Sequence, residues 1–502
     1  MERRDFLKML TAGSVTSGLF PSYTLSRMGE DGHGTSDDRY NVLFIGADDL
    51  NDWIGCMGGY PGVKTPNIDR LASRGMLFQN AHCAAPRCGP SRTALLTGIQ
   101  PSTSGVYANE RRSEYLPDAT TLPAHFRKNG YATFGGGKIF HGNTPGKNKR
   151  FNDEDAWDEY FYDHPMKTAP MPPDDKIPLN GLNLDGMFDW GGVDVPTETM
   201  GDARMVTWAN SVLARDHDQP FFLGVGFFRP HLPWYVPREY FDRYPIDEIT
   251  LPEVKEDDLE DVNIIAKEWA SLSSDHARIT DVPGKWKAAV QGYLACVSFV
   301  DDQVGRLLDA LDESRYSDNT VVVLWGDHGW HLGEKLHWRK FALWEEATHN
   351  PLIITAPGIA EPGTRTNQPA SLMDIYPTLI DLCGLENTAH DQDGMSLAPL
   401  LREPGKKRQR PALTTFGFMN HSLRNDRWRY IRYVDGSEEL YDHQNDPLEW
   451  NNLAGQPEYK GQKEKMARWL PDINVPGSSF TKMSGDSRDR VMEWFREQKR
   501  IW

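Results

Sequence analysis

The stretch YNVLFIGADDL, residues 40–50, is a short, unbroken apolar run that ends in two carboxylates. A continuous run of this length is typical of a strand buried on both faces of a largely parallel sheet. Helical patterns, the longest over about 285–313, alternate with further apolar runs from residue 40 to residue 385. This alternation predicts a doubly wound α/β domain.

Three of the expected strands end in ionisable residues: Asp48-Asp49, Lys138 with His141 in GGGKIFHG, and Asp327-His328. Ligands of open α/β sheets bind at the carboxyl ends of the strands. We therefore expect these side chains to converge at one edge of the sheet.

The two acidic strand ends offer three carboxylates and one imidazole, from Asp48, Asp49, Asp327 and His328. An isolated Asp-Asp pair is weak evidence, because acidic loops and caps contain it often. Two acidic strand ends that follow buried strands are stronger evidence for a metal site, since burying like charges is costly without a cation. Oxygen-rich sites suit Ca²⁺ or Mg²⁺.

The chain is acidic, with 502 residues and a formal net charge of −17. Its acidic residues are dispersed and argue against a nucleic-acid partner. An anionic substrate would need a locally cationic pocket. Besides Lys138 and His141, His231 in RPHLPW, Lys340 in GEKLHWRKF and Arg92 could supply one, although each alone could be a structural residue.

Cys88 opens the sequence Cys-Gly-Pro-Ser-Arg, which ends at Arg92 and precedes TALLTG, where we expect a helix to begin. Cys83 lacks the proline. This Cys-x-Pro-x-Arg motif resembles that of type I sulfatases of the alkaline-phosphatase-like superfamily. The resemblance runs from about residue 40 to 455 and is closest to the iduronate-2-sulfatase branch, on the segments NVLFIGADDLN, GKIFH, PHLPW, SFVDDQVGRLLDAL and DHGWHLGE. Two details differ from arylsulfatases: Lys-x-x-His replaces Lys-x-His, and Asp-His replaces Asp-Asn.

The resemblance implies an alkaline-phosphatase-like α/β fold, a large mixed sheet flanked by helices with a smaller C-terminal antiparallel-sheet subdomain. Period-two alternation over HSLRNDRWRYIRYVDGSEELYD independently predicts the small sheet, and a helix is expected over 489–502. The expected divisions are a signal and linker over 1–38, a catalytic domain over 39–390 and the C-terminal subdomain over 391–502. The ranges 143–200 and 233–283 are expected to be irregular.

In the family, the motif cysteine is oxidised to formylglycine, whose hydrated form supplies the nucleophilic oxygen. By resemblance, residue 88 attacks sulfur and forms a sulfo-enzyme intermediate. One Ca²⁺ would be held by residue 88 and by Asp48, Asp49, Asp327 and His328. That cation would lower the pKa of the hydrate and neutralise the sulfate.

The remaining roles follow in the same way. Lys138 and Lys340 would hold the sulfate oxygens as charge builds up. His231 would protonate the leaving sugar oxygen. His141 would take a proton from the second hydroxyl of residue 88, which expels sulfate, and Arg92 would position residue 88.

The N-terminal Arg3-Arg4-Asp5-Phe6-Leu7-Lys8 resembles a twin-arginine export signal. We expect export to the periplasm or beyond, and no stable membrane span, because no later segment reaches about 18 apolar residues. Five cysteines leave at least one thiol unpaired. Cys296 and Cys383 lie in apolar helical patterns and are expected in the core.

The expected partners are a sulfated carbohydrate and a formylglycine-generating or anaerobic sulfatase-maturing enzyme. The substrate could be a 2-O-sulfated uronate or an algal polysaccharide such as ulvan, fucan or carrageenan. Sugar contacts or simple packing could explain Asp189, Trp190, Trp234 and Trp330. Two alternatives stay open: a phosphonate or phosphodiester hydrolase of the same superfamily, and a non-catalytic binder of sulfated glycans.

Overall fold

The fold is seen in a computed structural model, which describes residues 39–141, 153–161, 172, 176–184, 187–271, 274–477 and 493. The expected signal and linker and the C-terminal helix over 489–502 lie outside the described residues, apart from residue 493. The described residues from Arg39 onward belong to one compact unit.

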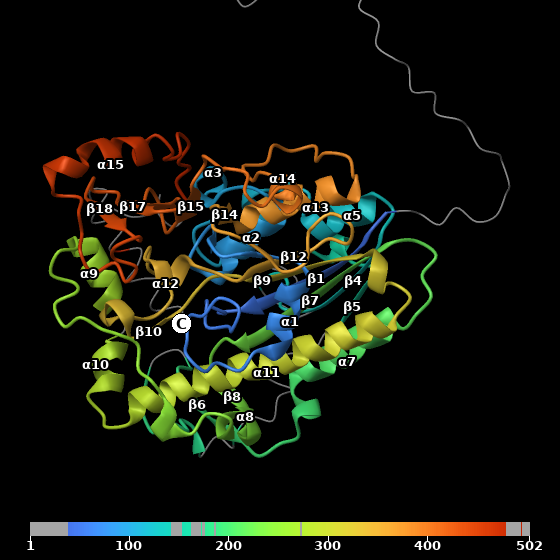
Figure 1. The fold of residues 1–502 in the computed structure, drawn as a ribbon, viewed down its shortest axis with the longest axis horizontal. Helices are drawn as coiled ribbons and strands as arrows, with labels where there is room; N and C mark the ends of the chain where they lie inside the picture. The colour runs from blue at the N-terminus through green and yellow to red at the C-terminus, as the bar shows by residue number, and fades with distance from the viewer. Residues whose placement is uncertain are drawn as a thin grey trace, which may run out of the picture. The chain divides into compact units, whose positions relative to one another are not determined.

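A mixed sheet forms the centre of the described chain (Figure 1). Strand β12 runs antiparallel to its neighbours β2 and β9, whereas the other pairings are parallel. Among the described residues its eight strands are, in spatial order, β13 (Thr364–Thr366), β2 (Met76–Phe78), β12 (Leu352–Thr355), β9 (Thr320–Gly326), β1 (Asn41–Asp48), β7 (Phe221–Pro230), β4 (Ala132–Gly137) and β5 (Glu159–Phe161).

Strand β1 lies at the centre of this sheet and is buried along its whole length. Leu43 and Ile45 pack on one face and Val42 and Phe44 on the other, as the alternation of side chains in a strand requires. Burial on both faces explains why the strand reads as an unbroken apolar run.

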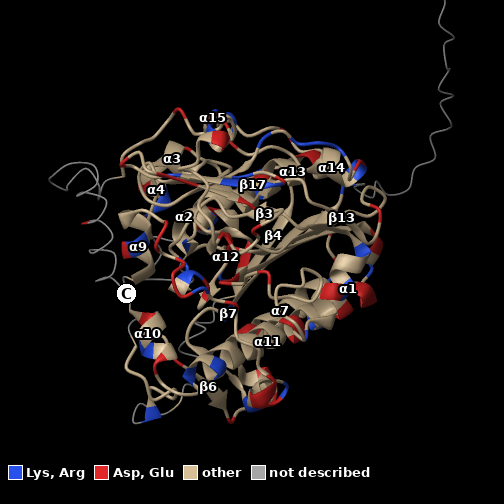
Figure 2. Cartoon of the chain, turned by 60° about the vertical axis from the view of Figure 1, so that its left-hand side comes forward, with Lys and Arg blue, Asp and Glu red and all other residues tan. Residues whose placement is uncertain are grey.

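Helices cover both faces of the sheet (Figure 1). One face carries α1 (Pro66–Arg74), α7 (Gly201–Leu213) and α11 (Lys285–Glu313). The other face carries α2 (Cys88–Thr97), α5 (Leu122–Lys128), α13 (Ile375–Cys383) and α14 (Ala398–Arg402). The α/β class and the long helix over about 285–313 are confirmed. Figure 2 shows acidic and basic residues interspersed along α1, α10 and α11.

The prediction that 233–283 is irregular was wrong. The segment contains β8 (Trp234–Pro237), α8 (Arg238–Asp242), α9 (Ile264–Ser271) and α10 (Asp275–Thr280). Helices this short have little stability of their own and too few residues to show a clear period, so tertiary packing forms them. Similarly, the described part of 143–200 contains β5 at the sheet edge and β6 (Trp190–Val193), which pairs with β8.

The C-terminal part contains the predicted small antiparallel sheet. It is a meander of β15 (Ala412–Thr415), β16 (His421–Arg424), β17 (Trp428–Arg432) and β18 (Glu438–Asp442), followed by α15 (Lys460–Ala467). Phe416, just after β15, packs on Trp269 of α9 with ring centroids 4.9 Å apart. The domain boundary at residue 390 stays a prediction.

The five cysteines are all buried free thiols. Cys296 lies in α11 and Cys383 in α13, and their place in the core is confirmed. Over the described part of the chain, the helices are too short or too polar to cross a bilayer.

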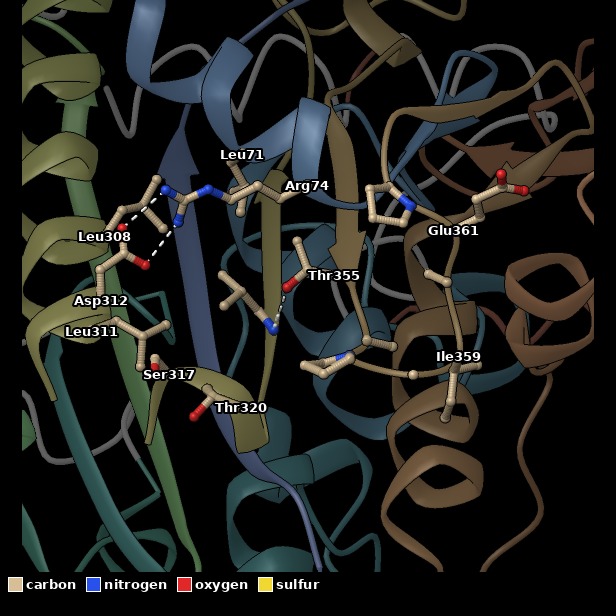
Figure 3. Close-up of a pocket in the computed structure, with 16 residues that line it drawn as sticks. Leu71, Arg74, Leu308, Leu311, Asp312, Ser317, Thr320, Thr355, Ile359 and Glu361 are labelled. Carbon is tan, nitrogen blue, oxygen red and sulfur yellow. Dashed lines mark hydrogen bonds and ion pairs between the residues drawn. The ribbon is translucent and has the colours of Figure 1, made fainter. Parts of the chain in front are cut away.

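A surface hollow of about 510 Å³ lies at the start of β9 (Figure 3). Thr320 of β9 lines it together with Arg74 and Asp312, whose side chains form two hydrogen bonds across it. Asp327 follows the other end of β9, and seven strand residues span roughly 20 Å. The hollow is therefore separate from the predicted site.

Candidate active site

Helix α2 presents Cys88 as its first residue, and Arg87 before it is extended. The sequence had predicted that this helix begins after Arg92. Pro90 does not prevent the earlier start, because proline is tolerated in the first turn, where its missing N–H needs no partner. Cys88 therefore lies at a helix N-terminus, where the partial positive charge favours an anionic group.

Asp48 is the last residue of β1, and Asp49 turns away from it with a left-handed φ of 63°. Aspartate is one of the few residues that adopt this conformation readily. The turn is held by two hydrogen bonds: the Asp49 N–H donates to Asp327 Oδ1 at 3.0 Å, and the Tyr293 hydroxyl of α11 donates to the Asp49 carbonyl at 2.8 Å.

The Cys88 sulfur lies among donors from two other segments. Lys340 Nζ is 3.1 Å from Cys88 Sγ, and His328 Nε2 is 3.3 Å from it. The Lys340 ammonium also pairs with Asp49 Oδ1 at 2.7 Å. All four side chains are buried.

Arg92, one turn along α2 from Cys88, joins the two acidic strand ends. Its Nε is 2.8 Å from Asp327 Oδ2 and its Nη2 is 3.2 Å from Asp48 Oδ1. Its Nη1 donates to the Lys138 carbonyl, while the Lys138 ammonium pairs with Asp48. The three predicted strand ends are thus brought together.

Two glycines allow the Lys138 segment to approach β7. Gly137 has a φ of 71°, a left-handed conformation that glycine adopts at no steric cost. A Cβ on Gly226 would lie 2.3 Å from the Lys138 carbonyl carbon. The Lys138 N–H donates to the Gly226 carbonyl at 2.7 Å, so a backbone hydrogen bond fixes the position of the Lys138 main chain.

The two remaining predicted histidines are only half-buried. His141 hydrogen-bonds to Cys88 and thereby helps to lower the pKa of its thiol. His231 follows β7, its Nδ1 lies 2.7 Å from the Leu232 carbonyl, and it lies near Asp48, whose pKa is lowered mainly by Lys138. Both imidazoles therefore border the buried charges.

Electrostatics favour the anionic form of residue 88. Burial would raise the pKa of the Cys88 thiol, but Lys138, Lys340 and His328 outweigh it and hold that pKa well below its usual range. Burial would lower the pKa of the Lys138 ammonium, but the neighbouring anionic groups of Asp48 and Cys88 outweigh it, and the net pKa is raised. Opposite charges, not solvent, set the ionisation of these groups.

The acidic strand end shows the competing effects. Burial raises the pKa of Asp327 to about 7, although Arg92 opposes it. Burial would lower the pKa of His328, but Asp327 raises it to about 9. Burial lowers the pKa of His141, so its neutral form is favoured there.

A group of four buried side chains could hold a metal ion: Asp48, Asp49, Cys88 and His328 place ligand atoms within 4.8 Å of one another. Asp49 Oδ2 is buried and accepts no hydrogen bond, which leaves one oxygen open to a cation. The fifth predicted ligand, Asp327, lies beside this group, and its oxygens accept hydrogen bonds from Arg92 and from the Asp49 N–H. The donor set fits a divalent cation.

The candidate sugar contacts serve the core. Asp189 accepts hydrogen bonds from the backbone N–H groups of Asn180 and Trp190, and Trp190 and Trp234 pack on each other with ring centroids 6.2 Å apart. Trp330 is also buried. Packing therefore accounts for all four.

Sequence reasoning missed two residues that hold the site. Ser91 donates its hydroxyl to the Asp327 carbonyl at 2.5 Å, and its position inside the cysteine motif was the available signal. Tyr293 braces Asp49 from α11, and no local pattern marks it, because its partner is more than 240 residues away along the chain.

Comparisons with known proteins agree with this geometry. The sequence profile of the family described as "Sulfatase" matches residues 40–385, and one described as "N-sulphoglucosamine sulphohydrolase, C-terminal" matches residues 326–475. A sulfatase of Formosa agariphila is 38% identical over 481 residues, covering 92% of this chain and 91% of that protein. Human iduronate 2-sulfatase is 32% identical over 414 residues, covering 74% of each chain.

Among solved structures, the phosphonate monoester hydrolase of Agrobacterium radiobacter superposes with a TM-score of 0.72 at 24% identity, covering 86% of this chain and 95% of that one. At that identity the likeness concerns the fold alone. The family model over residues 40–385 and the 38% identical relative show that the chain belongs to the sulfatase family, and it is a hydrolase of sulfate esters.

Proposed function

We propose that this enzyme releases sulfate from a sulfated sugar or polysaccharide, and that Cys88 is the residue converted to formylglycine. The observation that carries the proposal is the buried setting of Cys88 at the start of α2, with Lys340 and His328 donors 3.1 and 3.3 Å from its sulfur. The sulfur would stand where the formylglycine oxygen lies after conversion, and the same donors suit an oxygen anion there. The hydrated aldehyde would supply the oxygen nucleophile.

The charges of the pocket support a bound divalent cation. Three carboxylates, from Asp48, Asp49 and Asp327, face three permanent cations, from Lys138, Lys340 and Arg92. A Ca²⁺ ion would make the pocket cationic and favour ionisation of a hydroxyl on residue 88. It would be held by Asp48, Asp49, His328, residue 88 and Asp327.

The other side chains have roles that follow from their positions. Lys138 and Lys340 reach the reacting centre from two segments and would bind the sulfate oxygens. Half-buried His231 would protonate the leaving sugar oxygen at the rim. His141, whose pKa is lowered by burial, would accept a proton from residue 88. Arg92 would orient residue 88 through Asp327 and Asp48.

The substrate class rests on the relatives. Human iduronate 2-sulfatase, which the chain matches over 74% of each length, acts by its name on iduronate 2-sulfate. We propose a sulfated uronate or a related sulfated polysaccharide as the substrate. The twin-arginine-like residues 3–8 support export to the periplasm or beyond. The Cys-x-Pro-x-Arg motif that begins at Cys88 supports a formylglycine-generating or anaerobic sulfatase-maturing enzyme as partner.

The test is sulfate release by the converted enzyme, with Ca²⁺, from 2-O-sulfated iduronate, ulvan, fucan and carrageenan fragments, and turnover of a phosphonate monoester. Mass spectrometry of the peptide that holds residue 88 establishes conversion. Cys88→Ala should abolish release, whereas Cys83→Ala is the matched control, because Cys83 is buried nearby on the Ala347 carbonyl. Converted enzyme that releases no sulfate, or turns over only the phosphonate, would contradict the proposal.

A further inference from the structure

The loop that carries Lys340 has an unusual backbone. It joins β10 (His331–Leu332) to β11 (Trp338–Arg339) and runs on to Phe341. Four of its non-glycine residues have left-handed φ values: Lys335 at 56°, Leu336 at 49°, Arg339 at 74° and Phe341 at 74°. Each such residue costs about 1–3 kcal/mol and persists only where its surroundings fix it. Lys340 lies between two of them.

The Arg339 side chain is fixed by an ion pair. Its Nε lies 2.6 Å from Asp275 Oδ2, and both residues are buried, with the Arg339 side chain 9% and the Asp275 side chain 1% exposed. The guanidinium carbon also lies 4.7 Å from the centre of the Phe188 ring. A buried, charge-assisted pair of this kind holds its geometry far better than an exposed one.

The backbone on either side of Lys340 is tied as well. His337 Nε2 lies 2.7 Å from the Lys340 carbonyl, and the Phe341 N–H donates to the Pro86 carbonyl at 3.3 Å. The second tie joins the loop to the segment that leads into Cys88. These ties hold the backbone on the C-terminal side of Arg339, from which the Lys340 side chain reaches both Asp49 and Cys88.

We infer that Asp275 is a positioning residue for the reaction and that it acts through Arg339 on Lys340. Asp275 is the first residue of α10, in the 233–283 segment, and its side chain pairs with that of Arg339. Without its carboxylate, Arg339 would lose the contact that stabilises its left-handed backbone. The Lys340 ammonium would then leave its position 3.1 Å from Cys88 Sγ. This inference rests on the proposed role of Lys340.

The same loop offers a matched comparison. Lys335 is also left-handed and buried, and its Nζ pairs with Asp258 Oδ1 at 2.7 Å. The chemistry and burial resemble those of the Arg339–Asp275 pair, but Lys335 lies five residues before Lys340. Asp258→Ala should thus destabilise the loop base while leaving Lys340 near its partners.

The experiment compares Asp275→Ala, the milder Asp275→Asn and Asp258→Ala in the converted, Ca²⁺-loaded enzyme. Asp275→Ala should lower kcat about tenfold or more with a smaller change in KM, because misplacing a transition-state contact by 1 Å can cost about 100-fold. The kcat of Asp275→Asn should lie between those of Asp275→Ala and wild type. Asp258→Ala should keep kcat within about twofold of the wild-type value. In a Lys340→Ala background, adding Asp275→Ala should lower kcat by less than about twofold, since the two changes remove the same contact.

Hydrogen exchange tests the same inference without turnover. Amides of residues 333–341 should exchange faster in Asp275→Ala than in wild type. Equal exchange in that loop, an equal loss of kcat in Asp258→Ala, or an additive loss in the Lys340→Ala background would each overturn the inference. Absence of sulfate release by wild type would overturn the proposed function, while the exchange comparison would still decide the role of Asp275.

Discussion

Replacing Gly226 with alanine would place a methyl carbon 2.3 Å from the Lys138 carbonyl carbon and 2.4 Å from its carbonyl oxygen. Ordinary contact begins at 3.4 Å, so the Lys138 backbone must move by about 1 Å. The backbone of Gly226 itself is not left-handed, so the effect comes from this contact alone. Lys138 would carry its ammonium away from Asp48 and the sulfate position.

We expect Gly226→Ala to lower kcat by about 100-fold, the effect of a misplacement of about 1 Å at a reacting centre. Overpacking should also lower the free energy of unfolding by about 1–3 kcal/mol. The measurements are steady-state sulfate release and denaturant unfolding of the converted enzyme.

The control is Gly224→Ala, two residues earlier on the same face of β7. Its methyl would meet the side chains of Trp157 at 3.0 Å and Ile139 at 3.4 Å, which can adjust more easily than backbone. Gly224→Ala should therefore keep most of kcat. Wild-type kcat in Gly226→Ala, or equal losses in both variants, would refute the reasoning that backbone contact with β7 positions Lys138.

Arg92→Ala should lower the free energy of unfolding by about 3–5 kcal/mol in a denaturant titration, because it leaves the buried carboxylates of Asp48 and Asp327 without their shared cation; a loss below about 1 kcal/mol would contradict this. Chelation of divalent cations should lower the Tm, and the loss corresponds to about 2.7 kcal/mol of unfolding free energy for a ligand at 100 times its Kd. Asp49→Asn should largely remove the Tm difference between the metal-loaded and the chelated protein. Equal Tm shifts in wild type and Asp49→Asn would count against the metal site. Burial lowers the pKa of His421 from 6.5 to about 4, so between pH 6.5 and pH 4 the unfolded chain binds more protons than the folded one. The free energy of unfolding should therefore fall by up to about 3 kcal/mol as the pH drops through this range. Unfolding titrations at several pH values should show a smaller slope in His421→Gln, and an unchanged slope would exclude His421 as the cause.

Much of the central architecture could be predicted from local patterns. The apolar run before Asp48 is β1, the pattern over about 285–313 is α11, and the period-two alternation near the C-terminus is the small antiparallel sheet. The secondary structure of long or strongly periodic segments can be predicted, because residues at a regular spacing face the same environment. The short helices α9 and α10 escaped, because their stability comes from packing.

The sequence by itself determined the α/β class and the chemical types gathered at the strand ends, because chain order and periodicity encode them directly. Its Cys-x-Pro-x-Arg motif indicated the sulfatase family by resemblance. Only the tertiary structure decided which atoms meet: Arg92 between Asp48 and Asp327, Tyr293 on Asp49, and Asp275 on the loop of Lys340. These contacts join segments far apart in the chain. Their partners are chosen by packing and burial, where an unpaired charge is too costly to remain, and not by any local pattern.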